Sequence, residues 1–267
     1  MVHGPLYDRP PRTPDEIEAL RREVASVPAW YHAIDLGDGI VTPGPFELTG
    51  TLKHYPIPED MSGMRVLDVG ASNGFYSFEF ERRGAEEVIA LDLASWVDHD
   101  WGPRKRAEYA RYSEAERLAF DEQQMRGGFE VAAKALGSQR VKKVELPIYA
   151  ISPERLGMFD LVFSGAMLMH VRDPILGITR FRSVCKDDGA TVISISTSLE
   201  DTDDPLARFM GEWDQCNFWQ MNPACLRRVL EFADFQPTGE DVVYNEEAGE
   251  GSWRDDVYVV KARPRTD

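Results

Sequence analysis

Short apolar runs alternate with longer amphipathic stretches from Met64 onward. The apolar runs predict strands at 64–69, 87–92, 141–147, 159–164 and 189–196, with two more candidates near 239–244 and 255–262. The stretches between them favour helices at 74–83, about 105–136, 174–184 and 223–233. Because strands and helices alternate, the pattern predicts an α/β fold in which a mostly parallel sheet carries helices on both faces.

The first part of the chain follows a different pattern. Thr13, Pro14 and Glu16 are typical of a helix start, with a hydroxyl cap, a proline in the first turn and a carboxylate three residues after the cap. This helix is expected to run to about Ser26. Residues 30–58 are rich in glycine, proline and aromatics without a clear period, which is typical of a folded arm. We therefore expect an N-terminal arm or lid over 1–58 and one larger domain over 59–267.

The composition narrows the class of protein. Hydrophobic residues make up 43% and charged residues 28%, as in ordinary globular proteins. The formal charge of −16 opposes binding to nucleic acid, although it can also serve solubility alone. No stretch of about eighteen apolar residues and no signal-like segment is present, so we expect a cytoplasmic protein without membrane contact. Cys185, Cys216 and Cys225 have no metal-ligand spacing and are expected to be unpaired thiols.

A glycine-containing loop follows the first strand of the larger domain. Asp68 ends the strand, and Gly70 and Gly74 lack Cβ atoms where the backbone must pass close to a ligand. In an open parallel sheet, the first strand-to-helix turn is the usual floor of the ligand site. The spacing is GxxxG and not the GxGxxG of dinucleotide sites, which argues against NAD.

A carboxylate ends the second strand. Asp92 lies eighteen residues beyond Gly74, where it can accept hydrogen bonds from the two hydroxyls of a ribose. The structural alternative is that Asp92 only caps the following loop. Together with the glycine loop, it favours a nucleoside ligand without phosphates.

These two motifs resemble those of the class I S-adenosylmethionine (SAM) dependent methyltransferases. The resemblance implies a Rossmann-like, mostly parallel seven-stranded sheet, with SAM as cofactor and S-adenosylhomocysteine (SAH) as product. Ser72 replaces the middle glycine of the family loop, so we expect a shifted hydrogen bond to the cofactor. The cofactor-binding residues that the resemblance implies are Asp68, Gly70, Ala71, Ser72, Asn73, Gly74, Phe75, Asp92, Leu93, Ile148, Tyr149 and Ser164.

Residues 159–174 resemble the fourth strand and following loop of the same superfamily, which places His170 near the methyl group. Methyl transfer from a sulfonium needs alignment and, for a hydroxyl or amine acceptor, removal of a proton. A neutral imidazole can take that proton, so His170 and, in the arm, His32 are the candidate catalytic residues. The alternative for His170 is a structural histidine that bonds to the backbone.

The arm points to a narrower family. Residues 30–48 contain Gly44-Pro45-Phe46 and, with 217–235, resemble the tRNA wobble-uridine carboxymethyltransferases and their relatives. That family recognises the extra carboxylate of carboxy-SAM with a lysine just before Gly-Pro-Phe and a tyrosine just before the loop histidine. Pro43 and Gly44 offer no lysine, and Met169 replaces the tyrosine. Burying an unpaired carboxylate costs several kcal/mol, so ordinary SAM is expected, with Arg254 the remaining candidate partner for a carboxylate.

Weaker signals have structural alternatives. The basic run at 103–112 can touch RNA, or it can be a solvated helix face. Residues 98–101, DHDW, suggest a metal site only weakly, because adjacent side chains point apart, and we expect no bound metal. Trp30, Tyr31 and Trp219, with Trp213 and Phe218, can line an acceptor site or pack in the core.

The sequence thus predicts a SAM-dependent methyltransferase acting on oxygen or nitrogen of a small, aromatic or apolar organic acceptor. Two alternatives remain, a tRNA wobble-uridine-modifying enzyme and a catalytically silent SAM-binding protein. The family resemblance favours tRNA and the negative charge opposes it. The sequence leaves the oligomeric state open.

Overall fold

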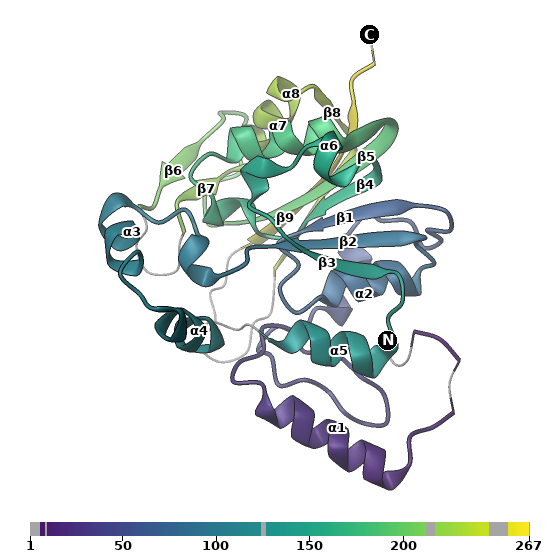
Figure 1. Cartoon of the computed structure of the whole chain (residues 1–267). Coiled ribbons are helices and arrows are strands. Elements are labelled where there is room, and N and C mark those ends of the chain that lie inside the picture. Colours follow the sequence, from purple (N-terminus) through teal and green to yellow (C-terminus); the bar gives the residue numbers. More distant parts are fainter. Residues whose placement is uncertain (1–5, 9, 124–126, 212–216, 246–255, 267) are drawn as a thin grey trace.

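A computed structural model describes residues 6–8, 10–123, 127–211, 217–245 and 256–266. Its centre is a seven-stranded sheet in the order β3-β2-β1-β4-β5-β9-β8 (Figure 1). The strands are β1 Arg65–Val69, β2 Glu87–Asp92, β3 Val141–Glu145, β4 Phe159–Ser164, β5 Cys185–Thr197, β8 Phe235–Asn245 and β9 Asp256–Pro264. The first five pair in parallel, and β9 runs antiparallel to both β5 and β8. The predicted α/β class is confirmed.

Helices cover both faces of the sheet (Figure 1). The predicted helices are found as α1 Pro14–Ser26, α2 Phe75–Arg82, α7 Pro174–Val184 and α8 Pro223–Phe232, with a short α6 at Pro153–Leu156. The predicted capping box of α1 is present, since Thr13 and Glu16 bond to each other's backbone amides. Successive strand residues point to opposite faces, so Val66 joins the core with α2, whereas Leu67 joins the core with α7 and α8.

The predicted single helix over 105–136 is wrong. The structure has three helices there, α3 Pro103–Tyr109, α4 Glu114–Gln123 and α5 Gly128–Leu136. Ser113 and Glu116 form a capping pair that starts a new helix at α4. Gly127 has a φ of +97°, a left-handed conformation that cannot continue an α-helix. The fifth strand also begins earlier than predicted, at Cys185 and not near residue 189.

Several short elements have no counterpart in the sequence prediction. A two-stranded sheet forms from β6 Ala207–Phe209 and β7 Trp219–Met221. Short 3₁₀ helices lie at η1 Thr49–His54, η2 Trp96–Asp98, η3 Ile148–Ala150 and η4 Leu168–His170. Helices α3 and α4 lie with β6 and β7 at one end of the molecule (Figure 1).

The N-terminal arm packs against the sheet. Leu20 of α1 and Ile34 and Leu36 of the arm belong to the same buried cluster as Val66 of β1. Two backbone hydrogen bonds hold the arm on itself, Ala33 N to Phe46 O at 2.8 Å and Thr42 N to Ile34 O at 3.0 Å. The arm is therefore one of the layers that bury the sheet, and the domain boundary at residue 58 stays a prediction.

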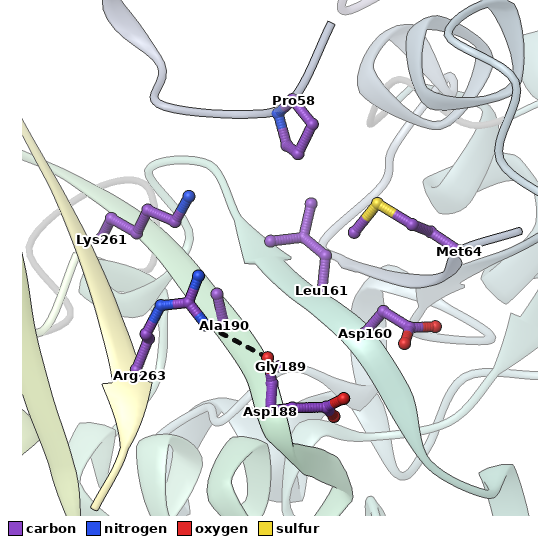
Figure 2. Close-up of a pocket in the computed structure, with 9 residues that line it drawn as sticks. All are labelled: Pro58, Met64, Asp160, Leu161, Asp188, Gly189, Ala190, Lys261 and Arg263. Carbon is purple, nitrogen blue, oxygen red and sulfur yellow. Dashed lines mark hydrogen bonds between the residues drawn. The ribbon is translucent and has the colours of Figure 1, made fainter. Parts of the chain in front are cut away.

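A cavity of about 200 Å³ lies at the edge where the parallel strands begin (Figure 2). Asp160 at the start of β4 and Lys261 and Arg263 of β9 line it. The Arg263 guanidinium donates to the carbonyl of Asp188 at 3.2 Å, and Asp160 pairs with Lys186 at 2.7 Å. Because ligands of such sheets bind beyond the strands' carboxyl ends, this cavity lies at the edge opposite the predicted site.

Candidate functional site

The glycine loop turns sharply at the carboxyl end of β1. Gly70, Ser72 and Gly74 all have positive φ angles, of 82°, 50° and 91°. The amides of Gly70 and Ala71 donate to the carbonyl of Leu91 at the end of β2, at 2.9 and 3.1 Å. A Cβ atom on Gly70 would lie 2.7 Å from Cγ of Met167. The loop therefore needs glycine here for its conformation and for its close approach to the loop after β4.

Asp92 lies at the carboxyl end of β2, beside the glycine loop. Its Oδ2 accepts a hydrogen bond from the amide of Ser72 at 2.8 Å, and its Oδ1 accepts one from the amide of Leu93 at 2.7 Å. The carboxylate thus caps its own loop and also fixes the loop after β1. Both the ribose assignment and the capping alternative are compatible with this position.

Asp68 lies behind the loop and is only 2% exposed. Burial raises the pKa of its carboxyl to about 7, a hydrogen bond from Ser77 Oγ at 2.5 Å lowers it, and the nearby Asp92 charge raises it. Near neutral pH this group is poised between its two forms. A bound cation would favour the ionised form.

The N-terminal arm is bonded directly to the glycine loop. The Asn73 side-chain oxygen accepts hydrogen bonds from the amides of Tyr31 at 2.6 Å and His32 at 3.4 Å. Trp30 is 4% exposed, and its ring packs directly on Gly128. A Cβ atom on Gly128 would lie only 2.5 Å from this ring. Among the predicted acceptor residues, Trp30 is thus placed in the core, whereas Tyr31 is half-buried beside the loop.

His32 is 5% exposed, and its Nδ1 has no hydrogen-bond partner among the described residues. Its ring lies 5.8 Å from that of Phe75, the first residue of α2. Burial lowers the pKa of the imidazole to about 3. The ring is therefore neutral and a weak base, which suits a hydrogen bond to a ligand better than removal of a proton.

The residues after β3 and at the end of β4 lie at the same edge. Ile148 packs against Gly177 of α7. A Cβ atom on Gly177 would lie 2.8 Å from Cδ1 of Ile148. The hydroxyl of Tyr149 donates to the carboxylate of Asp100 and accepts from the amide of Asp173 at 2.9 Å. Ser164 is fully buried at the end of β4, and its Oγ has no partner among the described residues.

His170 ends η4 and is half-buried. Burial lowers the pKa of His99 to about 4, and the charge of nearby His170 lowers it further, against the opposing effect of Asp100. The structure thus places two histidines that lie 71 positions apart in the sequence within range of each other's charge. The sequence suggests His99 only as a weak metal-ligand candidate, and among the described residues no group of three or more His, Cys, Asp or Glu side chains could hold a metal ion.

An aromatic cap covers the region around η4. We use this name for Val97, Trp101, Tyr109 and Phe218 with their neighbours Trp96, Tyr112, Phe120 and Trp219. The cap is bonded to the loop after β4: the amide of Phe218 donates to the carbonyl of Met169 at 2.8 Å, and Trp219 Nε1 donates to that of Arg172 at 3.0 Å. Trp213, Cys216 and Arg254 from the sequence analysis lie outside the described residues.

The site has features that fit SAM. The glycine loop lies at the carboxyl end of β1, where ligands of such sheets bind, and an ionised Asp68 favours a nearby cation such as an ammonium or sulfonium. His32 Nδ1 and Ser164 Oγ are buried polar atoms without partners among the described residues. Such atoms cost free energy unless a ligand or water satisfies them.

Comparison with known proteins agrees with this fit. Residues 48–238 match the family model described as a methyltransferase domain. The tRNA U34 carboxymethyltransferase of Pseudomonas paraeruginosa is 27% identical over 135 residues, which cover 50% of this chain and 33% of that protein. The enzyme of the same name from Tolumonas auensis is 25% identical over 197 residues, covering 70% of this chain and 50% of that one. The chain thus spans between a third and a half of the length of these curated relatives.

Solved structures share the fold. The N-terminal domain of EvdMO1, crystallised with SAH and D-fucose, superposes with a TM-score of 0.58 at 19% identity, covering 96% of this chain and all of that one. The YcgJ protein of Bacillus subtilis gives a TM-score of 0.52 at 13% identity, over 78% of this chain and 95% of that one. No helix in the described ranges is long and apolar enough to cross a membrane. The family match and the fold together establish that this chain belongs to the methyltransferase domain family, as a class I SAM-dependent methyltransferase.

Proposed function

We propose that this protein transfers the methyl group of SAM to an oxygen or nitrogen atom of a small, flat or apolar acceptor. The observation that carries the proposal is the aromatic cap, which is hydrogen-bonded to the same loop that holds His170. Aromatic faces favour flat apolar molecules and also stabilise a nearby positive charge. A wall of this kind beside the methyl group would bind the acceptor and exclude water.

The cofactor site of this proposal follows the edge of the sheet. The loop from Asp68 to Phe75 would hold the methionine part, Asp92 and Leu93 the ribose, and Ile148 and Tyr149 the adenine. His32 and Ser164 supply the buried polar atoms that a ligand can satisfy. SAM supplies an electrophilic methyl group on a sulfonium, and the protein's part is to align the acceptor with it.

His170 is the proposed proton acceptor. When an acceptor hydroxyl or amine forms its bond to the methyl carbon, the carbon–sulfur bond breaks, the thioether of SAH remains and the acceptor must lose one proton. His99 feels the charge of His170, and because burial keeps His99 neutral it adds no positive charge that would oppose uptake of that proton.

Ordinary SAM is the proposed methyl donor, in preference to carboxy-SAM. Pro43 stands directly before Gly44-Pro45-Phe46, so the position of the family's lysine carries no basic side chain in this protein. Met169 places an apolar side chain before His170. A carboxylate buried there without a partner would cost several kcal/mol, which is enough to reverse the preference of the site.

Modification of tRNA is the second candidate, since the curated relatives named above carry that activity in their names. The charge of −16 opposes it. The basic run is also partly engaged within the protein, because Lys105 lies 4.3 Å from the centre of the Trp101 ring and Arg106 lies 3.8 Å from Asp100. We therefore rank the small acceptor first.

Calorimetry with SAM, SAH and carboxy-SAM tests the cofactor assignment, and we expect SAM to bind more tightly than carboxy-SAM. Transfer of a radiolabelled methyl group to a panel of phenols, aromatic amines and unmodified tRNA then tests the acceptor. Labelling of small aromatic acceptors supports the proposal. Labelling of tRNA alone would replace it with the second candidate, and tight SAM binding without any labelling would favour a catalytically silent SAM-binding protein.

A further inference from the structure

Asp100 joins three parts of the carboxyl edge. Its side chain is 14% exposed and lies in the turn between η2 and α3. It accepts hydrogen bonds from the hydroxyl of Tyr149, after β3, and from the amide of Arg172 at 3.0 Å, after η4. These partners lie 49 and 72 positions away in the sequence.

The bonds around Asp100 form a closed ring. The consecutive amides of Arg172 and Asp173 donate to Asp100 and to the hydroxyl of Tyr149, respectively, and that hydroxyl donates to Asp100. The backbone of Arg172 and Asp173 is also bonded to the aromatic cap and to the start of α7. The carbonyl of Arg172 accepts from Trp219 of the aromatic cap, and the Asp173 side chain caps α7 through the amide of Leu176.

The hydrogen bonds to Asp100 are expected to stabilise this region more than its exposed ion pairs do. The guanidinium of Arg172 lies 3.2 Å from Asp100, but its side chain is 46% exposed, and that of Arg106 is 53% exposed. Exposed ion pairs of this kind contribute little to stability. Hydrogen bonds to a largely buried carboxylate are stronger, and removing the acceptor leaves two donors unpaired.

We propose that Asp100 is a positioning residue that couples the adenine side of the cofactor site to the acceptor wall. By fixing Tyr149 and the Arg172 backbone at once, it holds the aromatic cap over the site in the orientation that the cofactor needs. The inference rests on the proposed function, because that assigns Tyr149 to the adenine and the cap to the acceptor. The prediction is that loss of the carboxylate weakens cofactor binding through the displaced Tyr149 and Arg172 backbone.

The test compares Asp100→Ala and Asp100→Asn with Asp98→Asn as a matched control, since Asp98 is an exposed aspartate two residues away. SAH affinity is measured by calorimetry, and hydrogen exchange of residues 101–112 is measured without ligand. Asp100→Ala is expected to weaken SAH binding about tenfold and to speed exchange in this segment. Asp100→Asn keeps one carbonyl acceptor and should recover part of the affinity, and Asp98→Asn should match the wild type.

A double-mutant cycle with Tyr149→Phe separates coupling from a general structural effect. If Asp100 acts through Tyr149, the double variant binds SAH no more weakly than the worse single variant. Full additivity, or wild-type SAH affinity in Asp100→Ala, would overturn the proposal. So would an affinity loss in Asp100→Ala with unchanged exchange at 101–112. Failure of the wild-type protein to bind SAH would instead remove the proposed function, and this outcome is visible before any variant is made.

Discussion

At the scale of single residues, the candidate site contains polar groups whose pKa values are shifted by burial. Asp68 has a pKa raised to about 7, mainly because it is removed from water. His32 shows the opposite shift for the same reason, to about 3. Burial always disfavours the charged form, so it raises the pKa of an acid and lowers that of a base. Near neutral pH His32 is therefore uncharged, whereas Asp68 is divided between its neutral and ionised forms.

The first prediction concerns pH and Asp68. SAM carries an ammonium and a sulfonium, which favour the ionised carboxylate, so SAM affinity should rise between pH 5.5 and 8 with release of a proton. Calorimetry in two buffers of different ionisation heat measures both quantities. SAH lacks the sulfonium and should show a smaller dependence. Asp68→Asn should flatten the pH profile, and an unchanged profile in this variant would assign the dependence to another group.

The same shift affects the stability of the ligand-free protein. The folded-state pKa of Asp68 lies above the unfolded value of 3.8, so the folded state binds more protons between pH 4 and 7. Its contribution to stability is therefore present at low pH and lost as the pH rises through this window. Urea unfolding of Asp68→Asn at pH 5 and pH 8 checks the sign, since the variant should lose less stability over this range than the wild type.

The second prediction concerns His170. His170→Gln should lower kcat about a hundredfold with SAH affinity unchanged, because removal of a general base affects the chemical step and not cofactor binding. The measurement is methyl transfer to the acceptor found in the panel. His54→Gln is a suitable control, because His54 stacks on Tyr244 in another part of the chain. Near-normal turnover in His170→Gln would exclude the base assignment.

At the scale of elements, the contact between the arm and the glycine loop organises the site. Two arm amides share the side-chain oxygen of Asn73, so the loop after β1 is held by a segment about forty residues earlier. The arm keeps its shape because Gly44 lies directly against the backbone of His32.

The wrong prediction of one helix over 105–136 also concerns the scale of elements. Helical periodicity continued through that stretch, but Ser113 and Gly127 each imposed a local break.

The third prediction follows from Gly44. A Cβ there would lie 2.3 Å from the backbone of His32, and no side chain can move aside to relieve this contact. Gly44→Ala should lower the free energy of unfolding by about 2 kcal/mol or more, as overpacking does in cores. It should also weaken SAH binding, because a displaced His32 backbone would disturb the hydrogen bonds that the arm makes to Asn73 of the glycine loop. Gly50→Ala, where a Cβ meets nothing within 4 Å, is the control, and equal stability of the two variants would contradict the packing argument.

At the scale of the whole molecule, one hydrophobic core joins the arm to the sheet. Ile34 and Leu36 of the arm are as fully buried as Val66 and Phe78 of the larger domain. An arm that contributes this much to the core is expected to unfold together with the sheet. The two cysteines in the described part are unpaired, so no disulfide between them contributes to this stability.

The fourth prediction tests this cooperativity. The amides of Ala33 and Thr42 in the arm should exchange with solvent at the rate of global unfolding, like that of Leu67 in β1. Native-state hydrogen exchange measured over a series of denaturant concentrations gives the comparison. Early exchange in the arm, with β1 still protected, would show that residues 1–58 are a separate cooperative unit.

The sequence alone determined the fold class, the order of the main strands and helices, and SAM as the cofactor. Apolar periodicity is local, and glycine and aspartate at the end of a strand act through their own backbone and position. Only the tertiary structure decided that Asp100 meets Tyr149 and Arg172, that His99 lies near His170 and that Asn73 holds the arm. These pairs are separated by about forty to seventy positions. Whether such residues come close depends on how the helices, the arm and the sheet pack, and a local sequence pattern carries no information on that packing.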